Sequence, residues 1–213
     1  MAYSAPTTSP AAPSPRGSRR SLRWRVVDIV VASVLGVAAA LVFFAWNALY
    51  ETVTTPLSLV LPGSQSLLYG VWLFAGVIGA LVVRKPGAAL FTELVAAVVS
   101  ALLGAQWGGF GTIEAGLVQG LGAELVFLVF LYSNWRVYVA VLAGAGAGAA
   151  MAVNDLVLYY VGATTQFAVV YASCAVVSGA VIAGLGSWML ARGLARTGAL
   201  SRFASGREWF PGA

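Results

Sequence analysis

Residues 26–50, VVDIVVASVLGVAAALVFFAWNALY, decide the fold class, because this stretch contains a single charged side chain, Asp28. A run of about 20 apolar residues is long enough to cross the hydrocarbon core of a bilayer as an α-helix. Trp46 and Tyr50 at its end are typical of a helix that reaches the membrane–water interface. The stretch therefore predicts a membrane-spanning helix.

The rest of the chain has a similar composition. Of its 213 residues, 60% are hydrophobic and only 9% are charged, against about 25% charged in an ordinary soluble domain. Turn residues such as Pro, Gly and Asn divide it into six apolar segments: Val26–Tyr50, Ser66–Val83, Ala88–Ala105, Ile113–Tyr132, Val137–Val153 and Phe167–Ala191. We therefore predict an all-α integral membrane protein of the plasma membrane, with a six-transmembrane-helix bundle in residues 23–195.

Basic residues occur only in alternate connections. The 12 Lys and Arg residues lie in the two tails, in the second-to-third connection and in the fourth-to-fifth connection. The other three connections have none: residues 51–65, 106–112 and 154–166. Because cytoplasmic loops carry an excess of Lys and Arg, both termini are expected to be cytoplasmic. Residues 1–22, rich in Pro, Ser and Ala, are expected to form a disordered cytoplasmic tail, and residues 196–213 are expected to form a cytoplasmic C-terminal tail.

Several classes of function are excluded by residue usage. Cys174 is the only cysteine and the chain has no histidine, so Ser–His and Cys–His nucleophiles and Cys-based metal sites are not available. The sequence also lacks a G-x-x-x-x-G-K-[ST] motif for binding ATP. The basic residues flank apolar runs and form no patch for nucleic acid. We predict a protein that is not an enzyme and that needs no cofactor or metal.

Carboxylate and amide side chains lie within or at the ends of the third and fourth apolar segments: Glu93, Glu114, Gln119 and Glu124, with Glu114 near an interface and the others deeper. A carboxylate facing lipid costs at least about 2.5 kcal/mol, so such residues usually face the interior and carry function. No Lys or Arg lies within a predicted span to pair with them. The deeper ones are therefore candidates for ligand contact, with structural hydrogen bonding as the alternative.

Aromatic and amide side chains gather at the predicted outer ends of the helices: Trp46, Asn47, Tyr50, Tyr69, Trp72, Gln106, Trp107, Asn154, Tyr159 and Tyr160. An interfacial aromatic belt would explain part of this set. It does not explain the amides, and a pocket that opens to the outside accounts for both kinds of residue.

Small residues form a ladder on one face of the first segment: Ala32, Gly36 and Ala40. Such ladders let two helix backbones approach closely. The ladder is either an internal packing surface or a docking face for another membrane protein.

The chain resembles the substrate-binding S components of energy-coupling factor (ECF) transporters, in particular the YkoE type associated with thiamine and hydroxymethylpyrimidine. The matching stretches are Trp24–Val30, Tyr69-Gly70-Val71-Trp72, Arg84–Ala88, Thr92-Glu93-Leu94, Gln106-Trp107-Gly108, Gln119–Glu124 and Asn154-Asp155. They extend over roughly residues 24–207, so that only the tails are outside the resemblance.

The resemblance implies a six-helix protein that captures thiamine or hydroxymethylpyrimidine outside the cell and works with a transmembrane coupling subunit and two ATPase subunits. The face that such proteins place against the coupling subunit corresponds here to Ala32, Gly36 and Ala40. The alternative is a proton-coupled secondary transporter or ion pathway that uses intramembrane glutamates.

An aminopyrimidine has a polar edge that a carboxyl group can bind and a flat ring that can stack on aromatic faces. Glu93 and Glu124 are then expected to bind the polar edge. Gln119 and Asn154 are expected to fix its orientation. The ring faces are assigned to Trp46, Trp72 and Trp107. The mouth of the pocket is assigned to Asn47, Tyr69 and Gln106.

Overall fold

The computed structural model describes residues 22–200, 203, 205 and 206, and within them every regular element is helical. The elements are α1 (Val26–Val60), the 3-10 helix η1 (Ser64–Leu68), α2 (Gly70–Val83), α3 (Ala88–Leu102), α4 (Gly109–Val129), α5 (Val137–Leu158), α6 (Thr165–Ser178), the π-helix η2 (Gly179–Leu185) and α7 (Gly186–Arg196). The predicted tail at residues 1–22 lies outside the described residues except for Leu22, as does most of the chain after residue 200.

Five of the described helical segments are long and apolar enough to cross a membrane. They are α1, η1 with α2, α4, α5, and the continuous run of α6, η2 and α7. The remaining apolar helix, α3, is shorter. The prediction of an all-helical membrane protein is therefore confirmed. The first helix continues to Val60 and includes Pro56, beyond the end that the sequence predicted at Tyr50.

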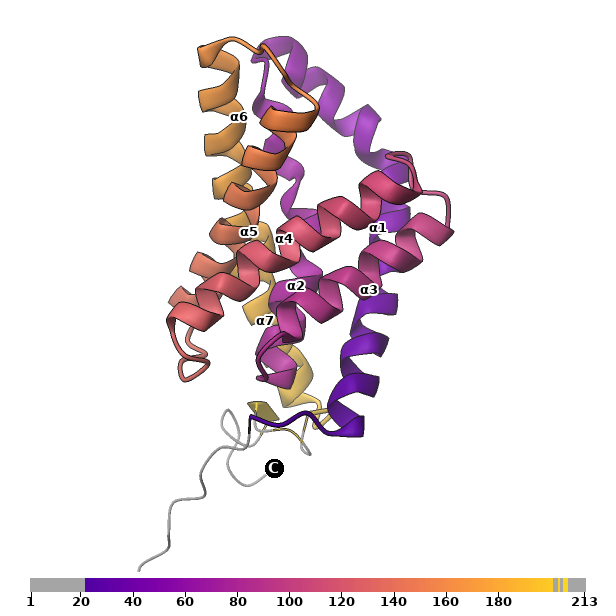
Figure 1. Ribbon diagram of the computed structural model, residues 1–213, viewed down its shortest axis with the longest axis vertical. Helices are drawn as coiled ribbons and strands as arrows, with labels where there is room; N and C mark the ends of the chain where they lie inside the picture. The colour runs from indigo at the N-terminus through magenta and orange to yellow at the C-terminus, as the bar shows by residue number, and fades with distance from the viewer. Residues whose placement is uncertain (1–21, 201–202, 204, 207–213) are drawn as a thin grey trace, which may run out of the picture.

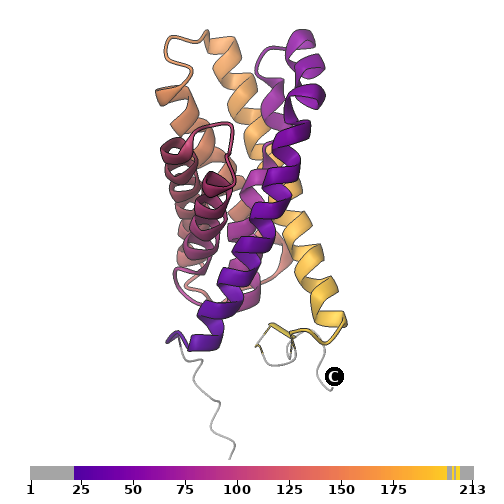
Figure 2. The same ribbon diagram turned by 90° about the vertical axis from the view of Figure 1, so that its right-hand side faces the viewer.

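The connections with basic residues meet at one end of the bundle. The indole nitrogen of Trp24 donates a hydrogen bond to the carbonyl of Pro86 at 2.8 Å, and the guanidinium of Arg84 lies 5.5 Å from the ring centre of Trp135. The start of α1, the α2–α3 turn and the α4–α5 turn are thus neighbours, and the end of α7 lies on the same side (Figures 1 and 2). We call this the basic end.

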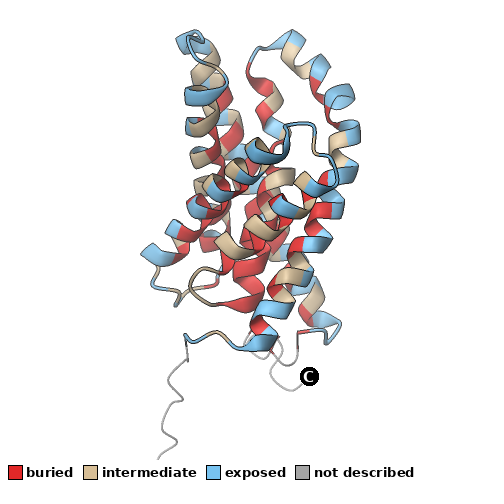
Figure 3. Cartoon of the chain, turned by 45° about the vertical axis from the view of Figure 1, so that its right-hand side comes forward, coloured by how far each residue is buried: buried red, intermediate tan, exposed pale blue. Residues whose placement is uncertain are grey.

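The outer surface is apolar, as a lipid-facing surface must be. Figure 3 shows the buried residues gathered between the helices. Large exposed side chains repeat along the outer face of α4 at Leu117, Leu121 and Leu125. This face has the helical spacing of a surface in contact with lipid tails.

The ladder of small residues on α1 lies inside the bundle. Ala32 and Ala40 are fully buried, and a methyl group added at Gly36 would be 2.7 Å from the side chain of Val95 on α3. Helix α3 thus covers the ladder at Gly36, which favours internal packing of the two alternatives, and a docking face at these three residues stays a prediction. Helices α3 and α4 run obliquely to α5 and α6 (Figure 1).

The last apolar segment is one continuous rod with a π-helical middle. Its small residues meet those of α5, since a methyl group added at Gly144 would be 2.1 Å from the carbonyl oxygen of Gly179. Two serines on the rod bind α2: Ser178 Oγ accepts from the Gly70 backbone N–H at 2.8 Å, and Ser187 Oγ donates to the Phe74 carbonyl at 3.1 Å. Close backbone contact thus holds α5, the rod and α2 together.

Candidate functional site

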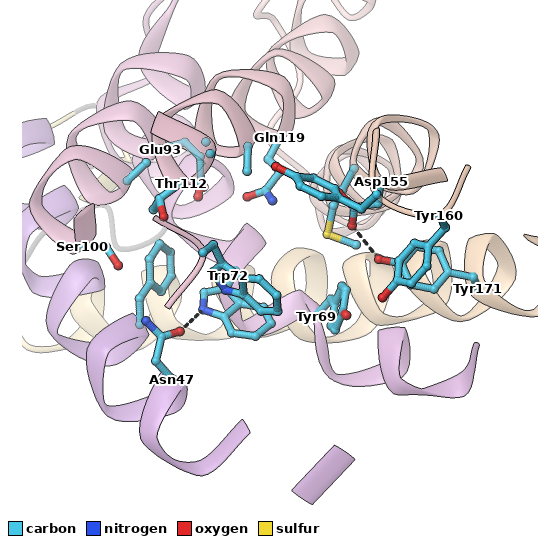
Figure 4. A pocket seen from close by; sticks show the side chains of 18 residues that line it. Asn47, Tyr69, Trp72, Glu93, Ser100, Thr112, Gln119, Asp155, Tyr160 and Tyr171 are labelled. Carbon is cyan, nitrogen blue, oxygen red and sulfur yellow. Dashed lines mark hydrogen bonds between the residues drawn. The ribbon is translucent and has the colours of Figure 1, made fainter. Parts of the chain in front are cut away.

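A cavity of about 220 Å³ lies between the helices, toward the end of the bundle opposite the basic end. Figure 4 shows its lining. The lining residues come from α1 to α6 and are mostly aromatic or small: Phe43, Asn47, Tyr69, Trp72, Glu93, Ala97, Ser100, Trp107, Gly111, Thr112, Ala115, Gly116, Gln119, Met151, Asp155, Tyr159, Tyr160 and Tyr171. An apolar cavity with a few convergent polar groups is the usual form of a site for a small molecule.

Glu93 is the most deeply buried polar residue of this lining, at 1% exposure. Its Oε2 accepts a hydrogen bond of 2.6 Å from the backbone N–H of Gly76 on α2. Its Oε1 is buried and has no hydrogen-bond partner among the described residues. An unsatisfied buried acceptor costs about 1–3 kcal/mol, so Oε1 is an acceptor to which a bound molecule can donate.

Glycines on the neighbouring helices make room for this carboxyl group. A methyl group added at Gly76 would be 3.2 Å from Glu93 Oε2, and one at Gly120 on α4 would be 3.1 Å from Glu93 Cβ. Because neither position has a side chain, the backbones of α2 and α4 approach Glu93 closely. Gln119, one residue before Gly120, is 8% exposed and lines the same cavity.

Tryptophans form one wall of the cavity. The Trp72 indole N–H donates to Asn47 Oδ1 at 3.0 Å, which fixes the orientation of its ring. The ring of Trp107 meets that of Trp72 edge to face, with 6.0 Å between the ring centres. Trp107 lies at the tip of the α3–α4 hairpin, between Gly104 and Gly108, both at positive φ, and its side chain is 51% exposed.

Tyrosines and a carboxylate form the opposite part of the lining (Figure 4). The hydroxyl of Tyr171 donates to Asp155 Oδ2 at 2.5 Å. The ring of Tyr171 lies 5.1 Å from that of Tyr160 and 5.8 Å from that of Tyr69, between ring centres. The hydroxyl of Tyr69 also shares a 2.7 Å hydrogen bond with that of Tyr50.

Glu124 does not line the cavity. Its Oε1 accepts from the backbone N–H of Gly87 at 2.5 Å and from the hydroxyl of Tyr132 at 2.8 Å. Its Oε2 accepts from the backbone N–H groups of Ala89 at 2.9 Å and Leu90 at 3.3 Å. The carboxyl group thus binds the start of α3 and the turn after α4, which is the structural alternative considered for it. Burial, and then the hydrogen bond to Glu124, raise the pKa of Tyr132.

Three other candidates also lie outside the lining: Trp46, Gln106 and Asn154. Trp46 packs edge to face behind Trp72, with 6.3 Å between ring centres. The side-chain amide of Asn154 donates to Glu114 Oε2 at 3.3 Å. The structure gathers the other six around the cavity: Asn47, Tyr69, Trp72, Glu93, Trp107 and Gln119.

Several lining residues were not predicted from the sequence: Phe43, Ser100, Thr112, Met151, Asp155 and Tyr171. Tyr159 and Tyr160 also line the cavity; the sequence placed them in the outer aromatic set but assigned them no role in binding. Asp155 follows Asn154 at a point that indicated a turn, but α5 continues to Leu158. One signal was present, because Asp155 is a carboxylate at the end of an apolar helix and next to a polar residue.

The fold and the cavity define a helical integral membrane protein with an internal site of the size of a small molecule. Comparison with known proteins makes the class more specific. The family of permease components of ABC-type cobalt transport systems matches residues 27–152. YkoE of Bacillus subtilis (strain 168), named as an HMP/thiamine permease, is 36% identical over 186 residues, which are 87% of this chain and 92% of that protein. The crystal structure of an S component of an ECF transporter matches with a TM-score of 0.79 and 36% identity, over 87% of this chain and 93% of that one.

The chain therefore belongs to the S components of ECF transporters, of the YkoE type. These are membrane transport proteins and not enzymes.

Proposed function

We propose that this S component captures thiamine or its hydroxymethylpyrimidine precursor from outside the cell and delivers it to a transmembrane coupling subunit driven by two ATPase subunits. Its relative YkoE carries the name HMP/thiamine permease. The observation that carries the proposal is the buried Oε1 of Glu93, which has no hydrogen-bond partner in the described part of the chain and belongs to the lining of an aromatic cavity.

Aminopyrimidine chemistry matches this group. The exocyclic amino group can donate to Glu93 Oε1, and a hydrogen bond to a charged acceptor contributes about 1.5–3 kcal/mol. Gln119 lines the same cavity, and its amide can donate to a ring nitrogen. The ring of Trp72, held by Asn47, provides an aromatic surface for the flat ring.

The lining favours an organic ring over the cobalt in the family's description. A transition metal takes several His, Cys or carboxylate ligands in one coordination sphere. Among the described residues there is no group of three or more such side chains that could hold a metal ion. The lining consists mainly of aromatic and small residues, which suit the faces of an aromatic molecule.

The membrane orientation is part of the proposal. Arg84, Lys85 and Arg136 all lie at the basic end, which is therefore assigned to the cytoplasm. The cavity then opens to the outside. With α3 counted as a span, the chain crosses the membrane six times and both termini are cytoplasmic.

The proposal is tested by identifying and measuring what the purified protein binds. We expect mass spectrometry to find thiamine or hydroxymethylpyrimidine released from it, and titration calorimetry of the emptied protein to give one site for which the two molecules compete. Binding of neither, together with pH-driven uptake in cells without the ATPase subunits, would support the proton-coupled alternative and reject this proposal.

A further inference from the structure

The part of the cavity around Asp155 has a chemistry different from the part around Glu93. Asp155 lies near the end of α5, and its Oδ2 accepts the 2.5 Å hydrogen bond from Tyr171. Three more tyrosines line the cavity with Tyr171: Tyr69, Tyr159 and Tyr160. We call these four tyrosines and Asp155 the tyrosine cage.

A carboxylate among aromatic faces is a typical site for an organic cation. The face of an aromatic ring attracts a cation, by about 0.5–1 kcal/mol at exposed sites and about 2 kcal/mol when water is excluded, and cages of aromatic residues recognise quaternary ammonium groups in this way. Asp155 adds a full negative charge. Glu114 is close enough to Asp155 to add to the negative potential there.

Nothing in the described lining balances this charge. Within the described part of the chain, no Lys or Arg lines the cavity. At the Glu93 part, a second carboxyl group also has an open acceptor, Oε1. The cavity therefore has two separate acidic positions, one on α3 and one on α5, with Trp72 and Gln119 lying between them in Figure 4.

We infer that the tyrosine cage binds a permanently cationic ring, and that Asp155 makes the site prefer a two-ring cationic ligand over its neutral one-ring fragment. This inference rests on the proposed function. A ligand with an aminopyrimidine at Glu93 and a thiazolium at Asp155 would use both acidic positions. The neutral pyrimidine alone would use only Glu93.

Phosphate esters of such a ligand are disfavoured by the same charges. A phosphate group brings about 1.5–2 negative charges at neutral pH, and the described lining has carboxylates but no Lys or Arg to receive them. We therefore expect thiamine monophosphate to bind more weakly than thiamine.

The experiment compares thiamine with 3-deazathiamine, a neutral molecule of the same shape in which carbon replaces the charged ring nitrogen. Titration calorimetry on the wild-type protein is expected to give a Kd for thiamine that is on the order of tenfold lower than the Kd for 3-deazathiamine. In Asp155→Asn we expect the two values to agree within about threefold, with the Kd for hydroxymethylpyrimidine unchanged. Glu114→Gln is the control, since Glu114 is near Asp155 but does not line the cavity. This variant should keep most of the difference between the Kd values for thiamine and 3-deazathiamine.

Each outcome has a separate meaning. Equal wild-type affinity for thiamine and 3-deazathiamine overturns this inference and leaves the proposed function standing. Failure of the wild type to bind thiamine and hydroxymethylpyrimidine rejects the proposed function itself. If Asp155→Asn does not fold, the same comparison is made with Tyr171→Phe. This variant removes the hydroxyl that holds Asp155 and should reduce the preference for thiamine, and an unchanged preference counts against the cage.

Discussion

Glu93 and Glu124 are chemically identical and lie on neighbouring helices, but their surroundings give them different roles. Glu124 accepts four hydrogen bonds, three from backbone N–H groups near the start of α3 and one from Tyr132. Glu93 accepts one, from Gly76, and its other oxygen, beside the cavity, has no partner among the residues that the structure describes. A ligand contact is therefore expected at Glu93 and a structural role at Glu124.

Replacing Glu93 by Gln tests this difference. Glu93→Gln keeps the shape of the side chain but removes the charged acceptor that the ligand's amino group would use. The lost hydrogen bond is worth about 1.5–3 kcal/mol, so the Kd for hydroxymethylpyrimidine should rise roughly 10- to 150-fold. The melting temperature of the empty protein should change little, because neutralising an unpaired buried carboxylate does not cost stability. Titration calorimetry and thermal unfolding measure the two effects.

The matched control is Glu124→Gln. Its carboxyl group is satisfied in the fold, so the amide should lower the melting temperature while ligand affinity in the folded protein stays within about threefold of wild type. If Glu124→Gln abolished binding and Glu93→Gln did not, the two roles would have to be exchanged.

The sequence alone identified both glutamates as unusual but could not distinguish between them. The partners of Glu124 are mainly backbone N–H groups near the start of α3, and backbone donors leave no signal in residue identity. Asp155 and Tyr171 were not predicted for a related reason. Tyrosines near a helix end fit an interfacial belt equally well, and only the three-dimensional arrangement brings Tyr171 onto Asp155.

At the scale of whole elements, small residues determine which helices touch. Gly36 of α1 packs on α3, and α5 packs on η2 through Gly144 and Gly179, whose added methyl groups would each be 2.1 Å from the other's carbonyl oxygen. Backbone atoms cannot move aside as a flexible side chain can. These contacts are therefore the least tolerant of added volume.

Gly144→Ala is expected to destabilise the bundle. The new methyl group would displace η2 from α5, and overpacking of this kind typically costs about 1–3 kcal/mol. Thermal unfolding of the purified protein in detergent should show a lower melting temperature.

Gly193→Ala on α7 is the matched control, because nothing lies within 4 Å of a methyl group there. Alanine is about 1 kcal/mol more favourable than glycine in a helix, so this variant should be at least as stable as the wild type. An unchanged melting temperature for Gly144→Ala would show that α5 and η2 separate easily.

The ends and the internal form of the helices were harder to predict than their existence. Each predicted apolar segment contains a helix, because apolar runs between turn residues leave few other solutions in a bilayer. The π-helix at Gly179–Leu185 was not predicted, since its sequence is as apolar as that of its neighbours. Two glycines of this segment, Gly179 and Gly184, lie against the backbone of α5, a tertiary contact that the sequence alone does not reveal.

At the scale of the molecule, the segregation of charge gives the bundle two chemically different ends. The basic end contains three connections joined by Trp24, Pro86, Arg84 and Trp135. The cavity and its aromatic residues lie toward the other end. Such asymmetry is expected of a protein that receives a solute on one side of a membrane and interacts with cytoplasmic partners on the other.

Single cysteines test the orientation. In a Cys174→Ala background, which removes the only native cysteine, Ala163→Cys in the α5–α6 connection should react with a membrane-impermeant maleimide on intact cells. Thr197→Cys, after α7, should react only after the membrane is opened. Both positions are exposed, so burial cannot explain a difference. Labelling of Thr197→Cys from outside would reverse the proposed orientation.

The unequal lengths of the helices affect the lipid around the protein. With a rise of 1.5 Å per residue, the 35 residues of α1 span about 52 Å, while the 15 residues of α3 span about 22 Å. A hydrocarbon core of about 30 Å is therefore shorter than α1 and longer than α3. On the flank of the α3–α4 hairpin the bilayer must thin or admit water, because the polar backbone at Gly104 and Gly108 cannot remain among lipid tails. Trp107, which lines the cavity, lies at the tip of this hairpin, so in the proposed orientation a solute from the aqueous phase would reach the cavity there without entering the hydrocarbon.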